Sequence, residues 1–128
     1  MDYQKQFAKD EFKVVAIDFD GVIHNHSLGY HDGTIYGDLI DGSKESIEKI
    51  HNMGFIIIIY TCKAHPNRPL VHGESGTELI WKWLKDKSID HFINDVVWGK
   101  PHALLYIDDK GYRFKNWKDT ISFVEKLK

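Results

Sequence analysis

Four runs of apolar residues constrain the fold of this chain more than any other feature of its sequence. The runs cover residues 14–17, 55–60, 96–98 and 104–107, and in none of them do polar and apolar residues alternate. A strand with one face in water shows such alternation, so these runs are typical of strands covered on both faces, as in a parallel sheet. The longest run is far shorter than the roughly 20 residues that a helix needs to cross a bilayer. We therefore expect a parallel sheet and no membrane contact.

The segments between the runs have helical spacing and recognisable end signals. Asp41 or Ser43 can cap a first helix that ends at Gly54, a residue suited to the left-handed conformation found after many helices. The apolar face of this helix would consist of Ile47, Ile50 and Met53. Ser75 and Glu78 form a capping-box pattern at the start of a second helix. Its apolar stripe would consist of Leu79, Ile80, Trp83 and Leu84.

A third helix is expected to begin near Lys118 or Asp119. Its buried residues would be Ile121, Val124 and Leu127. The order strand, helix, strand, helix, strand, strand, helix predicts an α/β fold, a three-layer α/β/α Rossmann-like sandwich with a central, mainly parallel sheet and right-handed crossovers. A length of 128 residues with 42% hydrophobic content is typical of one compact domain, so we expect residues 1–128 to form a single domain.

Two segments interrupt this rhythm. Residues 23–37 are polar and rich in glycine, and they contain Asp32-Gly33, a dipeptide favoured in tight hairpin turns. We expect a short flap hairpin there, directly after the first strand. Residues 63–73 contain two prolines and are expected to form an irregular loop.

Composition and charge limit the kinds of partner and the cellular location that we expect for this protein. The formal net charge of -2 provides no basic field that would attract duplex nucleic acid or an anionic membrane. The single cysteine, Cys62, cannot form an intramolecular disulfide, and residues 1–5 lack the apolar core of a signal peptide. We therefore expect a protein of the reducing cytoplasm.

Several residues able to support chemistry lie where the predicted strands end. In open α/β sheets ligands bind beyond the carboxyl ends of the strands, so the residue directly after each apolar run is informative. Those residues are Asp18, Thr61 and Asp108. Further charged side chains lie within a few positions of the runs, namely Asp20, Lys100 and Asp109. Two acid pairs, a hydroxyl and an ammonium group would thus converge on one rim of the sheet.

This set of side chains suits the transfer of a phosphoryl group. A phosphate monoester dianion repels an anionic nucleophile, so a carboxylate can attack it only if a divalent cation and a lysine neutralise the joint charge. Lys100 would hold Asp18 and the phosphate together, and Thr61 would donate a hydrogen bond to a phosphoryl oxygen. The oxygen ligands that Mg²⁺ prefers would come from Asp18, the backbone carbonyl of Asp20, and Asp108 or Asp109.

In this order the motifs resemble those of the haloacid dehalogenase superfamily of hydrolases. The four motifs are Asp18-Phe19-Asp20-Gly21-Val22, Thr61 after an apolar strand, Lys100, and the pair Asp108-Asp109. Each motif alone is common in proteins, and the resemblance depends on their ordered occurrence over residues 14–117. It implies a Rossmann-like fold and a phosphatase that uses Mg²⁺.

The resemblance also implies roles for individual residues. Asp18 would form an aspartyl-phosphate, while Asp20 would protonate the leaving oxygen and then deprotonate the attacking water as general acid and base. Related ATPases have Thr at the position of Asp20 and dehalogenases lack this second Asp, so its presence favours a phosphatase or a phosphomutase-type activity. The neighbours expected to contact substrate are Phe19, Cys62 and Lys63.

Members of the superfamily usually select substrate through a cap domain inserted after the first motif or between the second and third. Neither interval is long enough here, so the chain resembles the small capless members, whose open sites admit large substrates or are closed by a neighbouring subunit. A homo-oligomer is compatible with that arrangement. We expect a small phosphorylated molecule rather than a macromolecule, with a sugar phosphate, a nucleotide and a polynucleotide end as the candidates.

Other interpretations fit this sequence less well. A non-catalytic phosphate-binding or scaffold domain of the same fold is the main alternative to an enzyme. A phosphoacceptor receiver domain would place its lysine on the final strand, after the acids rather than before them. Zinc binding is disfavoured because the spacing matches no recurrent Cys/His pattern; the residues considered for it are His24, His26, Cys62, His65 and His72. For Arg68 and Arg113, a solvated surface position is preferred over contact with substrate.

Overall fold

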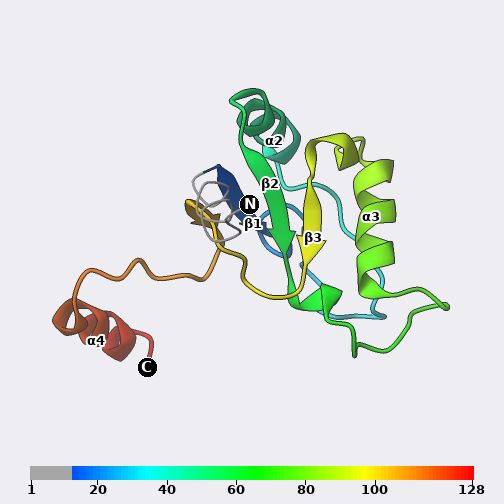
Figure 1. Cartoon of the computed structure of the whole chain (residues 1–128). Helices are drawn as coiled ribbons and strands as arrows, with labels where there is room; N and C mark the ends of the chain where they lie inside the picture. Colours follow the sequence, from blue (N-terminus) through cyan, green and yellow to red (C-terminus); the bar gives the residue numbers. More distant parts are fainter. Residues whose placement is uncertain (1–12) are drawn as a thin grey trace, which may run out of the picture.

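One parallel sheet organises the part of the chain that the structure describes, which is residues 13–128 of a computed structural model. Its strands are β1 (Val14–Asp18), β2 (Ile56–Tyr60), β3 (Asp95–Val97) and β4 (Leu105–Ile107). They lie in the order β3-β2-β1-β4, and each neighbouring pair is parallel (Figure 1). The α/β fold with a parallel sheet is therefore confirmed. Residues 1–5, which are expected to lack the apolar core of a signal peptide, lie outside the described residues.

The helices follow the predicted order along the chain. They are α2 (Ser43–Asn52), α3 (Gly76–Asp86) and α4 (Trp117–Lys126), with short 3-10 turns η1 (Cys62–Ala64) and η2 (Asp90–Phe92). Between residues 13 and 128, no helix is both long enough and apolar enough to cross a membrane.

Helices α2 and α3 cover the same face of the sheet. Both connect strands in a row, β1 to β2 and β2 to β3, and right-handed crossovers in one direction place their helices on one side. The shared core is built from alternate strand residues and the apolar stripes of the two helices. Its members include Val15, Ile17, Ile57, Ile59, Ile47, Ile80, Trp83 and Leu84. The predicted stripe of α3 is thus largely buried, whereas Met53 after α2 is exposed.

The two helix starts differ in how they are capped. The Ser75 hydroxyl accepts a hydrogen bond of 3.1 Å from the Glu78 amide, as the capping-box pattern predicted. At α2 the prediction that Asp41 or Ser43 is the cap is wrong. Gly42 occupies that position with φ of 87°, a left-handed conformation that glycine adopts without steric penalty, and no side chain caps the helix.

Helix α4 forms where expected but does not join the core. Ile121, Val124 and Leu127 are 50%, 53% and 70% exposed, so the prediction that they are buried is wrong. Figure 1 shows α4 at the end of a connection that leads away from the sheet. Apolar periodicity specifies a helix with one apolar face, but it does not specify the surface that this face contacts.

The flap after β1 has an antiparallel base and an irregular tip. The Ile40 amide donates to the Ile23 carbonyl at 2.9 Å, and the Asn25 amide donates to the Asp38 carbonyl at 3.0 Å. Beyond this base the chain forms successive turns in place of the paired strands expected of a hairpin. The Asp32 carboxylate accepts from the Thr34 amide and hydroxyl, and such local side-chain bonds compete with a strand ladder.

The contrast between α3 and α4 gives a test by core truncation. Leu84 on α3 is 0% exposed, so Leu84→Ala should lower the free energy of unfolding by about 2–5 kcal/mol through lost burial and the cavity left behind. Leu127→Ala, which removes the same atoms from a 70% exposed position, should change it by less than about 0.5 kcal/mol. Urea unfolding followed by circular dichroism measures both, and equal losses would contradict the exposed position of α4.

Candidate functional site

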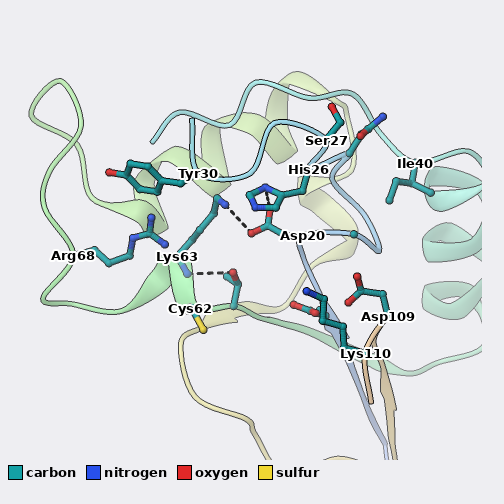
Figure 2. Close-up of a pocket in the computed structure, with 14 residues that line it drawn as sticks. Asp20, His26, Ser27, Tyr30, Ile40, Cys62, Lys63, Arg68, Asp109 and Lys110 are labelled. Atoms are coloured by element: carbon teal, nitrogen blue, oxygen red, sulfur yellow. Dashed lines mark hydrogen bonds and ion pairs between the residues drawn. The ribbon is translucent and has the colours of Figure 1, made fainter. Parts of the chain in front are cut away.

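The carboxyl ends of the strands open onto one cavity of about 640 Å³. Because the strands are parallel, the residues that follow β1, β2 and β4 reach the same rim. Six of the residues predicted from the sequence line this cavity, namely Asp18, Asp20, Thr61, Cys62, Lys63 and Asp109. Figure 2 shows this cavity with the side chains that line it.

Three other predicted residues lie elsewhere. The Lys100 ammonium lies 4.2 Å from the centroid of the Tyr106 ring and lines a different depression, together with Asp108. Phe19 is fully buried in the core, where its ring stacks on His24 with centroids 5.2 Å apart. The structure therefore does not bring Lys100 to Asp18, and it gives the Phe19 ring a packing position.

Asp18, the last residue of β1, is a half-buried carboxylate with acidic neighbours. Burial raises the pKa of Asp18, the Phe19 amide opposes this by donating to Oδ1 at 2.8 Å, and repulsion from Asp109 and Asp20 raises it further. A group whose pKa is raised in this way is costly to keep ionised. A cation bound at this rim would remove that cost.

Asp109 and Asp108 differ in what their carboxylates contact. The Asp108 carboxylate accepts hydrogen bonds from the amides of Gly111 and Lys110 and from the Tyr60 hydroxyl, and the amide donors lower the pKa of Asp108. Asp109 instead abuts Gly21, where any side chain would collide with its carboxylate. Among residues 13–128, no hydrogen bond or ion pair engages the Asp109 carboxylate. Asp109 is thus the member of the pair available to a ligand in the cavity.

Asp20 has two close partners. The Lys63 ammonium lies 2.7 Å from Oδ2 of Asp20, and Figure 2 shows the two side chains directed toward each other. Nδ1 of His24 lies 2.9 Å from Oδ1. Burial alone would raise the pKa of Asp20, but the hydrogen bonds from His24 and Lys63 outweigh it and hold the pKa below its ordinary value. Asp20 is therefore a carboxylate in this arrangement.

His24 was not expected to be a buried partner of Asp20. Its side chain is 0% exposed, and its Nε2 accepts a hydrogen bond of 2.9 Å from the Gly37 amide. Since Nε2 accepts, the ring proton of a neutral His24 is on Nδ1, where it is donated to Asp20. No local sequence pattern signals this contact, because it depends on the return of the flap chain at Gly37.

The donor atoms of Asp20, His24 and His26 lie within 4.8 Å of one another, which is close enough to hold a metal ion. Both ring nitrogens of His24 are already engaged, so this group is poorly suited to zinc without breaking the Gly37 contact. The other zinc set considered, Cys62, His65 and His72, does not form a cluster of donors in the described part of the chain. Asp18 and Asp109, which offer carboxylate oxygens, fit a hard cation such as Mg²⁺ better.

Thr61 and Lys63 are positioned by the turn that follows β2. The Thr61 amide donates to the Val97 carbonyl at 3.0 Å, and Oγ1 of Thr61 accepts from the Lys63 amide at 3.2 Å. The hydroxyl proton of Thr61 thereby stays available to a ligand. Gly76, at the start of α3, lies so close to the Lys63 carbonyl that any side chain there would collide with it.

Further residues line the cavity without having been predicted as ligands. From the flap come Asn25, His26, Ser27 and Tyr30, and from the loops come Arg68 and Lys110. Lys110 directly follows Asp109, so its position could have been read from the motif. Tyr30 and Arg68 are distant in sequence and meet only in the folded chain.

No protein-family model, curated protein or solved structure matches this chain. The functional interpretation therefore depends on the chemistry and geometry of the rim.

The raised pKa of Asp18 predicts how its substitution changes stability. A carboxyl group whose folded pKa is above its unfolded value destabilises the protein at neutral pH, and this cost disappears as the pH falls below the ordinary value of 3.8. Asp18→Asn, which keeps an acceptor for the Phe19 amide, should raise the melting temperature at pH 7 in EDTA, with the gain vanishing near pH 3.

The control for this measurement is Asp86→Asn, at an exposed position on α3, which should leave the melting temperature nearly unchanged. Addition of Mg²⁺ should raise the melting temperature of the unsubstituted protein more than that of Asp18→Asn, because a ligand that binds the folded state stabilises it. A destabilised Asp18→Asn protein in EDTA would contradict the interpretation.

Proposed function

We propose that this chain is a Mg²⁺-dependent phosphohydrolase of the haloacid dehalogenase type, acting on small phosphate monoesters. The observation that carries the proposal is the meeting, in one cavity, of the carboxylates of Asp18 and Asp109 with the hydroxyl of Thr61 and the ammonium of Lys63. Neither Asp18 nor Asp109 forms an ion pair with a described cation. This combination suits a metal-assisted displacement at phosphorus.

Asp18 and Asp109 are the side chains that would hold Mg²⁺, together with the backbone carbonyl of Asp20. When bound, the ion supplies positive charge that allows two anions, a carboxylate and a phosphate, to approach each other. Repulsion from Asp109 contributes to the raised pKa of Asp18, which supports a cation as the missing component. The chemistry of the donors, all oxygens, agrees with this choice.

In the proposed reaction, a carboxylate oxygen of Asp18 forms a bond to phosphorus while the bond to the ester oxygen breaks. Asp20 supplies the proton that the departing alkoxide needs, and in the second step it takes a proton from the water that releases phosphate. The resting Asp20 is ionised through Lys63 and His24. An incoming phosphate dianion would draw the Lys63 ammonium toward itself and so favour the protonated form that acts as the acid.

In this proposal Lys63 neutralises the charge of the substrate phosphate, the role that the motif resemblance implied for Lys100. Lys63 is 6% exposed and lines the cavity, whereas Lys100 is exposed and lines other depressions. An ammonium group held against the substrate phosphate stabilises the charge that spreads over the phosphoryl oxygens in the transition state. Thr61 would donate a further hydrogen bond to the same oxygens.

A non-catalytic phosphate-binding domain is the second candidate. The position of Lys100 outside the cavity favours it, because the lysine of the third motif would then be missing from the reacting groups. The two candidates differ in what happens to a bound phosphate monoester: the enzyme releases inorganic phosphate, and the binding domain does not.

The assignment of Lys63 gives a direct test with a matched pair of lysines. With Mg²⁺ and p-nitrophenyl phosphate, Lys63→Gln should lower kcat/KM by about 10²- to 10³-fold, the usual cost of one transition-state donor. Lys100→Gln should lower it less than about threefold, since the side chain is not in the cavity. A larger loss for Lys100→Gln than for Lys63→Gln would assign the neutralising role to Lys100 after all.

The nucleophile and the metal are tested together by phosphate release. Asp18→Asn should abolish turnover, and Asp20→Asn should lower kcat by about 10²- to 10⁴-fold through loss of acid and base assistance. Removal of Mg²⁺ with EDTA should stop the reaction, and restoring Mg²⁺ should recover it. Full activity of Asp18→Asn would contradict the proposed nucleophile. Binding of phosphate esters without turnover by the unsubstituted protein would contradict the enzyme function and support the non-catalytic phosphate-binding domain.

A further inference from the structure

Tyr30 and Arg68 form a pair at one end of the cavity. The reaction proposed above does not use this pair. Cζ of Arg68 lies 5.3 Å from the centroid of the Tyr30 ring, and both side chains line the same cavity as Asp18. Figure 2 shows them beyond Lys63, at the opposite end from Asp109 and Lys110. The pair thus lies where the part of a substrate remote from its reacting phosphate would extend.

Arg68 carries a charge that no acidic side chain among residues 13–128 neutralises. The ion pairs of residues 13–128 engage several lysines, including Lys63 with Asp20 and Lys82 with Glu74, but none includes Arg68. Its other described contact is made by its backbone, whose amide donates to the His65 carbonyl at 3.1 Å. Arg68 is half-buried, and with no acidic partner in the described part of the chain its guanidinium is placed to bind an anion, since the planar fork matches carboxylate and phosphate.

The backbone and the ring restrict where this guanidinium can go. Pro69 follows Arg68 directly and Pro66 precedes it by two residues, so the backbone at both prolines has a fixed φ. The Tyr30 ring attracts the cation to its face by a cation–π interaction. This arrangement also leaves that face of Tyr30 covered, which disfavours it as a stacking surface for a nucleobase.

The size of the cavity agrees with a substrate larger than a simple phosphate ester. Its volume of about 640 Å³ is within the range of roughly 300–1,000 Å³ found for sites that enclose small organic molecules. The carboxylates of Asp18 and Asp109 lie at the end of the cavity where the reacting phosphate would bind. The Arg68 guanidinium supplies positive charge at the opposite end.

We infer that the substrate is a phosphate monoester that carries a second anionic group, a carboxylate or a second phosphate, and that Arg68 binds this group beneath Tyr30. The inference rests on the proposed phosphohydrolase function and names its substrate class. Sugar phosphates without a second anionic group would leave the Arg68 charge without a partner and would be poorer substrates.

Paired substrates that differ only in the second group test this inference. 3-Phosphoglycerate and glycerol 3-phosphate have the same phosphorylated carbon, but one has a carboxylate where the other has a hydroxymethyl group. Fructose 1,6-bisphosphate and fructose 6-phosphate make the corresponding pair for a second phosphate. With Mg²⁺ present, kcat/KM should favour the member with the second anion by about tenfold or more in at least one pair, since a charge-assisted pair is worth at least that.

Substitution of Arg68 should remove this preference. Arg68→Gln should bring the ratio of kcat/KM within the preferred pair close to one, mainly through KM, and Arg68→Lys should give an intermediate ratio because it keeps the charge and loses the fork. Arg113→Gln is the matched control, because Arg113 is exposed and lines a different depression, and it should leave the ratio unchanged. Melting temperatures establish that each variant is folded.

The outcomes separate this inference from the proposed function. A ratio at or below one in both pairs, or a ratio that survives both Arg68→Gln and Arg68→Lys, overturns the inference while hydrolysis of p-nitrophenyl phosphate leaves the phosphohydrolase standing. A preference for nucleoside monophosphates that depends on Tyr30 and not on Arg68 also overturns it. If no phosphate ester is hydrolysed, p-nitrophenyl phosphate included, both proposals fall together.

Discussion

The side chain of Lys63 is almost entirely buried, and the one carboxylate partner of its ammonium group among the described residues is Asp20. A buried charge needs such a partner, so the loop after β2 and the loop after β1 are held together by the same contact. Asp20 in turn binds His24, which accepts from the Gly37 amide, and the Gly37 carbonyl accepts from Trp83 of α3 at 2.9 Å. The ion pair therefore connects the candidate site to the core helix through a continuous series of hydrogen bonds.

The fold was predictable where burial and sequence pattern agree. The unbroken apolar runs around Ile17 and Ile57 predicted strands of a parallel sheet, and the stripe of α3 predicted its buried face, so the order of strands and helices along the chain could be inferred. Helix α4 illustrates the limit. Its apolar positions predict a helix, but the direction of the preceding connection decides whether the helix reaches the sheet, and no periodic pattern encodes that direction.

Some residues of the candidate site could likewise be predicted from the sequence and others could not. Asp18, Thr61 and the Asp108-Asp109 pair could be placed in advance because they lie at or just beyond the ends of their strands, and parallel strands bring their carboxyl ends to one rim. Lys100 lies in the connection between β3 and β4, and its distance from the strand ends depends on the course of that loop. The contacts of His24 depend on residues far along the chain, so they appear only after folding.

The two hydrogen bonds of the Gly37 backbone have a further consequence for the flap. They fasten the returning end of the flap to His24 on one side and to α3 on the other, and the Asn25 carbonyl leaves no space for a side chain at this position. The base of the flap is thus built as part of the core, while its tip is held by turns, by the Tyr36 hydroxyl and by the contact of Tyr30 with Arg68. In the proposed phosphohydrolase, residues at the tip could consequently be exchanged to suit a different substrate without moving the carboxylate of Asp20, so that substrate selectivity could evolve separately from the proposed reacting groups.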